Sequence, residues 1–308
     1  MTGTTGFIGK ALQPKLEERG YEVHTIERYV TGRYGLDERS TKHYGNLTDY
    51  EHVNRIFREV DPDYVIHLAA ISPVSFSYDN FMEVTEVNYM ASVNLAEASR
   101  KLSHLDKFIV AGTSEMYGME LQDPNGKLSE QSKLIPNSPY AVAKTAFSMY
   151  LTYLYMAFKF PYIELRPFNT YGRHDNKHFF IERVITKMLE NPSGNITLGD
   201  STAIRDWMYV DDIVDGYIKA LESENSVGNS INLCTGKGYT TEYTANLIAS
   251  KLGFTGKIEW NSTAPRPLDA RILIGDNSKA ARLLGWKPKY DLSEGLDKTI
   301  EYFKGEYK

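Results

Sequence analysis

The sequence predicts a doubly wound α/β fold, in which helices cover both faces of a parallel β-sheet. Three observations favour it. A glycine-rich loop runs directly into a helical pattern, apolar runs alternate with helical patterns through the first half, and the run from Tyr64 to Ala70 is almost unbroken. A strand without a polar face is typical of a parallel sheet that is buried on both sides.

The glycine-rich loop spans Gly3 to Gly9, with glycine at every third position, and precedes a predicted helix over Lys10 to Arg19. Glycines let backbone amides approach a pyrophosphate, and the helix N-terminus adds partial positive charge. A plain strand-to-helix turn would also explain the loop. However, a second strand is predicted over Tyr21 to Ile26, and Glu27 follows it, where an acidic residue binds the ribose of an adenine dinucleotide. Arg28 can stack on adenine or hold a 2′-phosphate, so NAD and NADP both stay open.

The alternation of strands and helices is predicted to begin without a first strand. Met1 and Thr2 lead at once into the glycine loop, although the first strand of such a fold is normally central in the sheet. Its loss would leave a gap between neighbouring strands and unpaired backbone groups in the core. We expect this strand to be missing or truncated, and we favour a true start a few residues upstream over a fold that tolerates the defect.

The alternation continues through the first half. A loop over Gly45 to Asp49 precedes a predicted helix over Tyr50 to Val60. The buried strand that follows ends in the small residues Ala69 and Ala70, which leave room for a cofactor at the carboxyl edge of the sheet. A helix from about Val84 to Lys101 and a strand over Lys107 to Gly112 complete the pattern.

Composition excludes several classes of protein. The 308 residues are 42% hydrophobic and 24% charged with a net charge of −5, which is typical of a globular protein and gives no basic footprint for nucleic acid. A single cysteine, Cys234, rules out an internal disulfide and indicates a reducing compartment. Neither a leader nor an apolar run of membrane-spanning length is present. We therefore predict a cytoplasmic protein with no membrane partner.

A candidate catalytic pair follows in the middle of the chain. Ser138 is a good N-cap and Pro139 suits the first helical position, so a helix is predicted to begin there. Tyr140 and Lys144 then lie one turn apart on the same face. An ammonium beside a phenol favours the phenolate, so Tyr140 can remove a proton from a hydroxyl near neutral pH. The pair alone is a weak signal, because it also occurs on many surface helices.

The strand before this pair runs into Thr113-Ser114-Glu115, which should project toward the cofactor edge of the sheet. With these residues the chain resembles the extended short-chain dehydrogenase/reductase family, the sugar-nucleotide epimerases and dehydratases. The resemblance covers essentially the whole chain. It rests on the glycine loop, the run His67-Leu68-Ala69-Ala70, Thr113-Ser114-Glu115, Tyr140 with Lys144, and motifs of the second half.

The resemblance implies a role for each catalytic candidate. Tyr140 acts as base and acid at the sugar C4 hydroxyl, Lys144 lowers its pKa and binds the nicotinamide ribose, and Thr113 hydrogen-bonds the C4 oxygen. Glu115 implies a 4,6-dehydratase, since it would remove the C5 proton before the C6 hydroxyl leaves as water. Ser114 before it matches the GDP-mannose 4,6-dehydratases, in which the glutamate serves as both base and acid.

Alternatives stay open at this point. Decarboxylases and 4-keto-6-deoxy-sugar reductases of the family also carry Ser-Glu-x-Tyr-Gly, and a C4 epimerase needs only hydride transfer. A non-catalytic dinucleotide-binding protein is a rival of another class, against which the joint presence of Thr113, Tyr140 and Lys144 argues. Glu27 favours NAD, although the GDP-mannose enzymes generally prefer NADP. The cofactor contacts that the resemblance implies are Gly3, Thr5, Gly6, Phe7, Ile8, Glu27, Arg28, Asn46, Leu47, Leu68, Ala69, Ala70, Tyr140 and Lys144.

The second half resembles the substrate-binding part of the family. The resemblance implies a cofactor domain over residues 1–165, to which residues 204–235 return, and a smaller α/β domain for a nucleotide-diphosphate sugar over 166–308. Asn169, Arg205, Arg266 and Ser72 are the implied substrate contacts. Arginine suits a phosphate because its planar fork makes two parallel charge-assisted bonds.

No metal site is predicted. Val210 to Asp215 is better explained as a strand end followed by a helix that an aspartate caps. His174 and His178 lie in a loop-like region, where zinc ligation is not expected. The aromatic residues Tyr150, Tyr153, Tyr155 and Phe158 are expected to pack rather than to bind a ligand. The resemblance further implies a homodimer through a four-helix bundle that includes this helix and the one around Val93.

Overall fold

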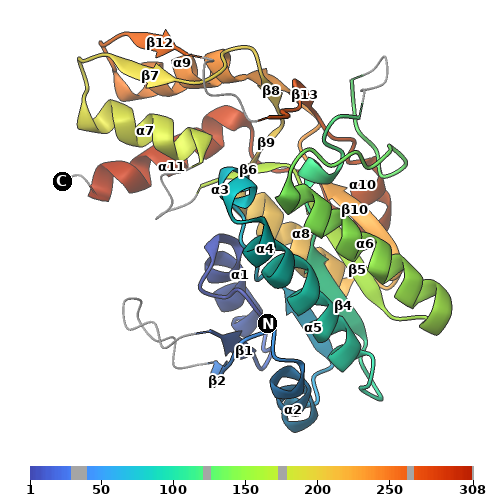
Figure 1. Ribbon diagram of the computed structural model, residues 1–308. Helices are drawn as coiled ribbons and strands as arrows, with labels where there is room; N and C mark the ends of the chain where they lie inside the picture. Colours follow the sequence, from blue (N-terminus) through green and yellow to red (C-terminus); the bar gives the residue numbers. More distant parts are fainter. Residues whose placement is uncertain (29–39, 121–125, 173–178, 262–266, 307–308) are drawn as a thin grey trace.

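The doubly wound α/β fold is confirmed by a computed structural model that describes residues 1–28, 40–120, 126–172, 179–261 and 267–306. Its main sheet is parallel and has two parts, β2-β1 and β3-β4-β5-β10 in spatial order (Figure 1). The strands are β1 (His24–Glu27), β2 (Thr41–Tyr44), β3 (Tyr64–His67), β4 (Lys107–Ala111), β5 (Tyr162–Pro167) and β10 (Asn229–Leu233).

The first two residues of the chain join these two parts. Thr2 pairs in parallel with Ile26 of β1 on one side and with His67 of β3 on the other. Thr2 therefore lies between β1 and β3, next to the glycine loop. At the opposite end, a pocket of about 250 Å³ lies between β1 and β3 and is lined by residues that include Val23 and Tyr64. The gap expected between neighbouring strands is thus confined to the amino end of the sheet.

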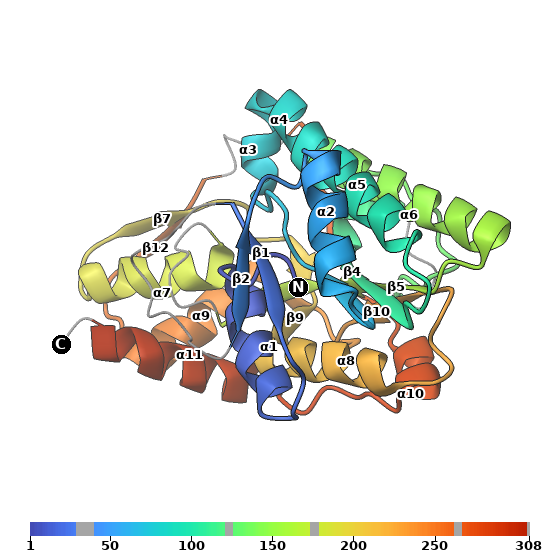
Figure 2. The ribbon, with the colours of Figure 1, turned by 90° about the horizontal axis from the view of Figure 1, so that it is seen from below.

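Helices cover both faces of the sheet (Figure 2). On one face α1 (Phe7–Glu17), α8 (Val210–Glu222) and α10 (Ser278–Leu284) share a core with Ile109 of β4. On the other, α2 (Tyr50–Val60), α5 (Ala91–Ser99) and α6 (Pro139–Phe158) pack around Phe108 and Val110. Successive side chains of a strand point to opposite faces, so the apolar run of β4 fills both cores.

The helix expected over Val84 to Lys101 is not regular, and this prediction was wrong in detail. It consists of α4 (Phe81–Thr85), a π-helical turn η1 (Glu86–Met90) and α5, which ends at Ser99. The wider turn carries Asn88, whose side chain bonds both backbone groups of Ile71 in the loop after β3. The periodicity of apolar residues cannot reveal this π-helical turn, because the turn accompanies a contact that Asn88 makes outside the helix.

The predicted aspartate cap of the helix after Val210 was also wrong. Helix α8 has Tyr209 at its N-cap. Asp212 lies in the first turn and accepts hydrogen bonds from the amides of Lys289 at 2.8 Å and Tyr290 at 3.1 Å. The carboxylate therefore joins the helix to a distant segment of the chain.

A second, smaller unit lies beside the carboxyl edge of the main sheet (Figure 1). Its core is formed by α7 (Phe180–Glu190), α9 (Thr241–Leu252) and α11 (Leu292–Glu306) with the paired strands β7 (Ile196–Leu198) and β12 (Ile258–Trp260). Short strands connect it to the first unit: β6 (Asn169–Tyr171) with β9 (Trp207–Tyr209), and β8 (Ile204–Arg205) between β11 (Tyr239–Thr240) and β13 (Ile272–Leu273). Among the described residues, no helix is long and apolar enough to cross a membrane.

Candidate active site

The glycine loop packs tightly against the segment that follows β3. Gly3 has a φ of +72°, and a Cβ added there would lie 2.6 Å from the amide nitrogen of Ala69. A Cβ at Gly9 would lie 2.2 Å from the carbonyl oxygen of Gly3. Because the N-cap of α1 is Gly6, no side chain of the cap residue covers the first helical amides. The loop thus forms a close backbone approach to a helix N-terminus, which is the arrangement that binds a pyrophosphate.

The predicted cofactor residues come to one edge of the sheet. Glu27 ends β1 and Arg28 follows it, exposed. Asn46 and Leu47 follow β2, while Leu68, Ala69 and Ala70 follow β3. The carboxyl ends of parallel strands lie at the same edge, so these segments meet beside the glycine loop, where Thr5 and Gly6 are exposed and Phe7 and Ile8 are half-buried.

The turn that carries the catalytic candidates Thr113, Ser114 and Glu115 lies at the same edge. It is the 3₁₀ turn η2 (Ser114–Met116), with Thr113 as its N-cap. The Thr113 hydroxyl oxygen accepts a hydrogen bond of 3.2 Å from the Glu115 amide, so its hydrogen can point to another acceptor. Thr113 and Ser114 are buried, whereas Glu115 is half-buried.

Helix α6, which carries Tyr140 and Lys144, packs against this turn. The Ser138 hydroxyl accepts a hydrogen bond from the Ala141 amide at 3.2 Å, and Pro139 is the first helical residue, as predicted. Lys144 is buried, and its Nζ donates to the carbonyl oxygen of Ala111 at 2.9 Å. Burial lowers the pKa of Lys144 to about 8, against the opposing effect of Glu164.

The substrate candidates are less closely gathered. The Oδ1 atom of Asn169 is buried without a hydrogen-bond partner among the described residues. Arg205 is buried, and its guanidinium pairs with Asp269 at 3.0 Å. Ser72 is exposed in the loop before α3 (Val74–Asp79). Arg266, like His174 and His178, lies outside the described residues.

Two asparagines that the sequence analysis missed hold the cofactor loops. The Asn88 side chain accepts from the Ile71 amide at 2.8 Å and donates to the Ile71 carbonyl at 2.9 Å. Asn94 donates to the carbonyl oxygens of Leu47 and Thr48, both at 3.0 Å. The sequence did contain one signal for these contacts, namely asparagine side chains within an otherwise apolar helix, because a buried side-chain amide needs hydrogen-bond partners.

The comparisons with known proteins agree with this geometry. The sequence model of the family described as GDP-mannose 4,6 dehydratase matches residues 1–299. A GDP-mannose 4,6-dehydratase of Vibrio cholerae is 30% identical over 344 residues, with 96% of this chain and 90% of the relative covered.

Solved structures of epimerases are equally similar. The UDP-glucose 4-epimerase of Thermotoga maritima with UDP-glucose has a TM-score of 0.91 and 31% identity, covering 100% of this chain and 98% of that chain. The Thermus thermophilus UDP-glucose 4-epimerase in complex with NAD has a TM-score of 0.87 and 30% identity, covering 99% and 98% of the two chains. The chain therefore belongs to the extended short-chain dehydrogenase/reductase family, among the NAD-dependent sugar-nucleotide epimerases and dehydratases.

Proposed function

We propose that the protein is a nucleotide-sugar 4,6-dehydratase that converts a GDP-mannose-like substrate into its 4-keto-6-deoxy form. The observation that carries this proposal is Glu115, which lies in the catalytic turn, two residues from Thr113 and next to the N-terminal part of α6. Proton removal from C5 requires a base beside the groups that act on C4, and Glu115 supplies one. The description of the matching family model supports the same activity.

The residues at the sheet edge fit NAD. The glycine loop leaves no room for a Cβ at Gly3 or Gly9, and the hydroxyl of Thr4 within the loop is buried without a partner among the described residues. We assign the pyrophosphate to this loop and the adenosine ribose to Glu27, with Arg28 beside it. When bound, NAD would supply the reversible hydride acceptor, so the overall conversion would consume none of it.

The chain's own residues would perform the proton transfers. Tyr140 would take the proton of the C4 hydroxyl while Thr113 donates a hydrogen bond to the C4 oxygen. The Lys144 ammonium, held by the Ala111 carbonyl, would stabilise the Tyr140 phenolate. Glu115 would remove the C5 proton and return it to the departing C6 hydroxyl, which leaves as water. The hydride taken from C4 would return to C6, and C5 would regain a proton that exchanges with solvent. The balance is the loss of one water with no net oxidation of the sugar.

We assign the sugar-nucleotide diphosphate to Asn169, Arg205, Arg266 and Ser72. The Asn169 Oδ1 atom supports this assignment, because a buried acceptor without a protein partner is expected to meet a ligand or water. The division into a cofactor unit ending at residue 165 and a substrate unit stays a prediction, as does a cytoplasmic location.

A C4 epimerase is the second candidate, and the high similarity to the Thermotoga maritima epimerase favours it. The experiment that separates the two is incubation of the purified protein with GDP-mannose, UDP-glucose and dTDP-glucose without added cofactor. We expect mass spectrometry to show the loss of one water from GDP-mannose. A C4 epimer of unchanged mass would move the assignment to epimerase. Turnover of a 4-keto sugar with stoichiometric NADPH consumption would indicate a reductase, and cofactor binding without any turnover would indicate a non-catalytic protein.

The Glu115→Gln variant tests the role of Glu115 directly. We expect it to retain NAD binding and to stop the incorporation of solvent deuterium at C5, which NMR can follow in D₂O. Incorporation at the wild-type rate would mean that another residue is the C5 base.

We also propose a homodimer formed through α6 and the segment from α4 to α5. Apolar side chains are exposed along one stripe of α6, among them Met149 at 67% and Met156 at 72%, and Met82 of α4 is 71% exposed. Such a patch is costly on a monomer and typical of an interface. We expect Met149→Glu to yield monomers in size-exclusion chromatography with light scattering. Tyr243→Glu, at an exposed position on α9, should leave the dimer intact.

A further inference from the structure

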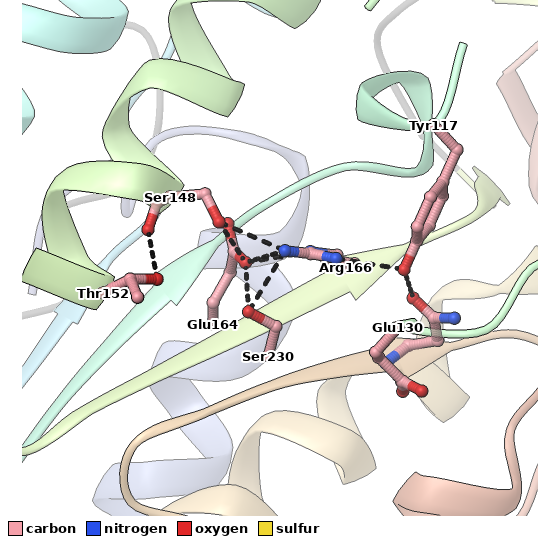
Figure 3. Close-up of polar contacts among 8 residues, drawn as sticks. Tyr117, Glu130, Ser148, Thr152, Glu164, Arg166 and Ser230 are labelled. Atoms are coloured by element: carbon pink, nitrogen blue, oxygen red, sulfur yellow. Dashed lines mark hydrogen bonds and ion pairs between the residues drawn. The ribbon is translucent and has the colours of Figure 1, made fainter. Parts of the chain in front are cut away.

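A buried ion pair lies on β5 next to the catalytic helix, and the proposed reaction does not use it directly. Glu164 and Arg166 are 2% and 4% exposed and occupy alternate positions of the strand, so both side chains lie on the same face. The Arg166 Nε donates to Oε2 of Glu164 at 2.9 Å (Figure 3). Removing one member of a buried charged pair leaves an uncompensated charge, so the groups around the pair matter for what it holds in place.

Two serine hydroxyls complete the environment of the carboxylate. Ser148 of α6 and Ser230 of β10 donate to Oε2 of Glu164 at 2.8 and 2.6 Å. Both hydroxyl oxygens accept from the Arg166 Nη2, at 3.1 and 3.2 Å. Ser148 lies one turn after Lys144, so these bonds tie the catalytic helix to β5.

The other side of Arg166 reaches the catalytic turn. Its Nη1 donates to the hydroxyl oxygen of Tyr117 at 3.1 Å, and Tyr117 immediately follows η2 (Figure 3). The Tyr117 hydroxyl donates to Oδ1 of Asn232 at 2.7 Å. Burial raises the pKa of Tyr117 to about 12, so this donor stays protonated. Arg166 therefore connects the turn that carries Glu115 to the strand that contacts α6.

Glu164 also lies beside the peptide that holds Lys144. A Cβ added to Gly112 would lie 3.1 Å from Oε1 of Glu164, and the preceding carbonyl, that of Ala111, accepts from the Lys144 Nζ. Burial and then the charge of Lys144 lower the pKa of His67 on β3 to about 3, so this neighbour stays neutral. Titratable groups near Lys144 include Tyr140 on α6, Glu115 on the turn, His67 on β3, and Glu164 and Arg166 on β5. The elements α4, η1 and α5, which also pack against α6, contribute Glu83, Glu86, Tyr89 and Glu97.

We propose that Glu164 and Arg166 are positioning residues for the catalytic pair: Glu164 supplies the buried negative charge that holds Lys144 as an ammonium, and Arg166 anchors the catalytic turn to β5. The inference rests on the proposed function, in which Lys144 stabilises the Tyr140 phenolate. Burial lowers the pKa of Lys144, and the negative charge of Glu164 opposes this effect by raising it.

The Glu164→Gln variant keeps the shape of the side chain and removes its charge. Lys144 then loses its proton at lower pH, so the alkaline limb of the kcat/KM profile moves down by roughly one pH unit. The acidic limb moves to higher pH, because Lys144 is protonated for less of the time and therefore stabilises the Tyr140 phenolate less. A purely structural role would lower the whole profile without moving either limb, and that result would overturn the role of Glu164.

Two further variants test the roles of Glu164 and Arg166 separately from the folding of the protein. The double variant Glu164→Gln with Arg166→Met leaves no uncompensated guanidinium, so it should fold even if the single variant does not, and it should show the same displaced limbs. Tyr117→Phe removes the contact between Arg166 and the turn without changing any charge. We expect it to lower kcat with KM and both limbs unmoved, and an unchanged kcat would overturn the role of Arg166.

A readout without turnover separates this inference from the proposed function. The near-ultraviolet absorbance of tyrosinate is titrated in the holoprotein, and the Tyr140 contribution is obtained by subtracting the curve of Tyr140→Phe. Glu164→Gln should move this difference curve to higher pH. A displaced curve in a protein that turns over no sugar nucleotide supports the inference and contradicts the proposed function. If Glu164→Gln turns over the sugar nucleotide with both limbs of its pH profile and its tyrosinate titration curve unchanged, the inference is overturned and the proposed function stands.

Discussion

The residues proposed for proton transfer and those proposed to contact the substrate differ in how their polar groups are held. In the first group, Lys144 is tied to the Ala111 carbonyl and Ser138 caps the catalytic helix. In the second, Arg205 is paired with Asp269, and Asn169 retains a buried acceptor without a partner among the described residues. The groups proposed for proton transfer are thus held by protein contacts, whereas Asn169, proposed as a substrate contact, keeps an unused buried acceptor.

The largest expected effect tests the residues proposed for proton transfer. Tyr140→Phe removes the proton-transfer group while preserving the ring, so we expect kcat to fall by roughly 10²–10⁴ with no loss of thermal stability. Steady-state kinetics on the accepted sugar nucleotide measure it. Tyr153→Phe, at an exposed position of the same helix, is the matched control and should retain full activity. A Tyr140→Phe enzyme as fast as the wild type would exclude Tyr140 from the reaction.

The next prediction concerns the ion pair of Arg205, a proposed substrate contact. Arg205→Lys should raise KM by roughly 10- to 100-fold with little change in kcat, because a bidentate charged contact is lost from ground state and transition state alike. Asp269→Asn should lower KM, since it releases the guanidinium for the diphosphate. If both variants lowered kcat and left KM unchanged, Arg205 would not be a substrate contact.

Asn169 allows affinity and stability to be separated. Asn169→Ala removes an unsatisfied buried acceptor, so the free energy of unfolding should not decrease, although an unpaired polar group normally costs about 1–3 kcal/mol. KM for the sugar nucleotide should rise by roughly tenfold if this acceptor meets the ligand. Urea unfolding and steady-state kinetics measure the two quantities. A less stable protein with unchanged KM would assign Asn169 a structural role.

The smallest expected effect compares two helix caps. Ser138 caps α6 and Thr240 caps α9, each accepting a hydrogen bond from a backbone amide, at 3.2 and 3.0 Å. Replacement of either by alanine should cost about 1 kcal/mol of stability. Only Ser138→Ala should also reduce kcat, because of these two helices α6 is the one that carries the residues proposed for catalysis. An equal loss of activity in Thr240→Ala would show that stability alone explains the effect.

The features that the sequence predicted correctly depend on residues that lie close together in the chain. The helix start at Ser138 and Pro139 follows from capping chemistry, and the bounds of α2 follow from its amphipathic pattern. The crowding at Gly3 and Gly9 follows from the backbone approach that the loop requires. The parallel sheet with helices on both faces was likewise implied by the alternation of apolar runs and helices.

The remaining features depend on partners that are distant in the chain. Asp212 does not cap α8, because the amides of Lys289 and Tyr290 take its carboxylate. Asn88 requires a π turn, because its partner is Ile71. Both asparagine and aspartate can serve several local roles, and the choice among them is made by whichever donors or acceptors the fold brings near.

The sequence by itself determined the fold class and the glycine loop at the edge of the sheet, and it supplied the candidates for proton transfer, because each depends on spacing along one loop, strand or helix. The tertiary structure alone decided how those residues are supported. In the sequence, Glu164 and Arg166 are visible only as two charged residues in an apolar strand. Their partners Tyr117, Ser148 and Ser230 come from three other parts of the chain. A buried charge is tolerated only where such partners converge, and convergence is a property of the folded chain.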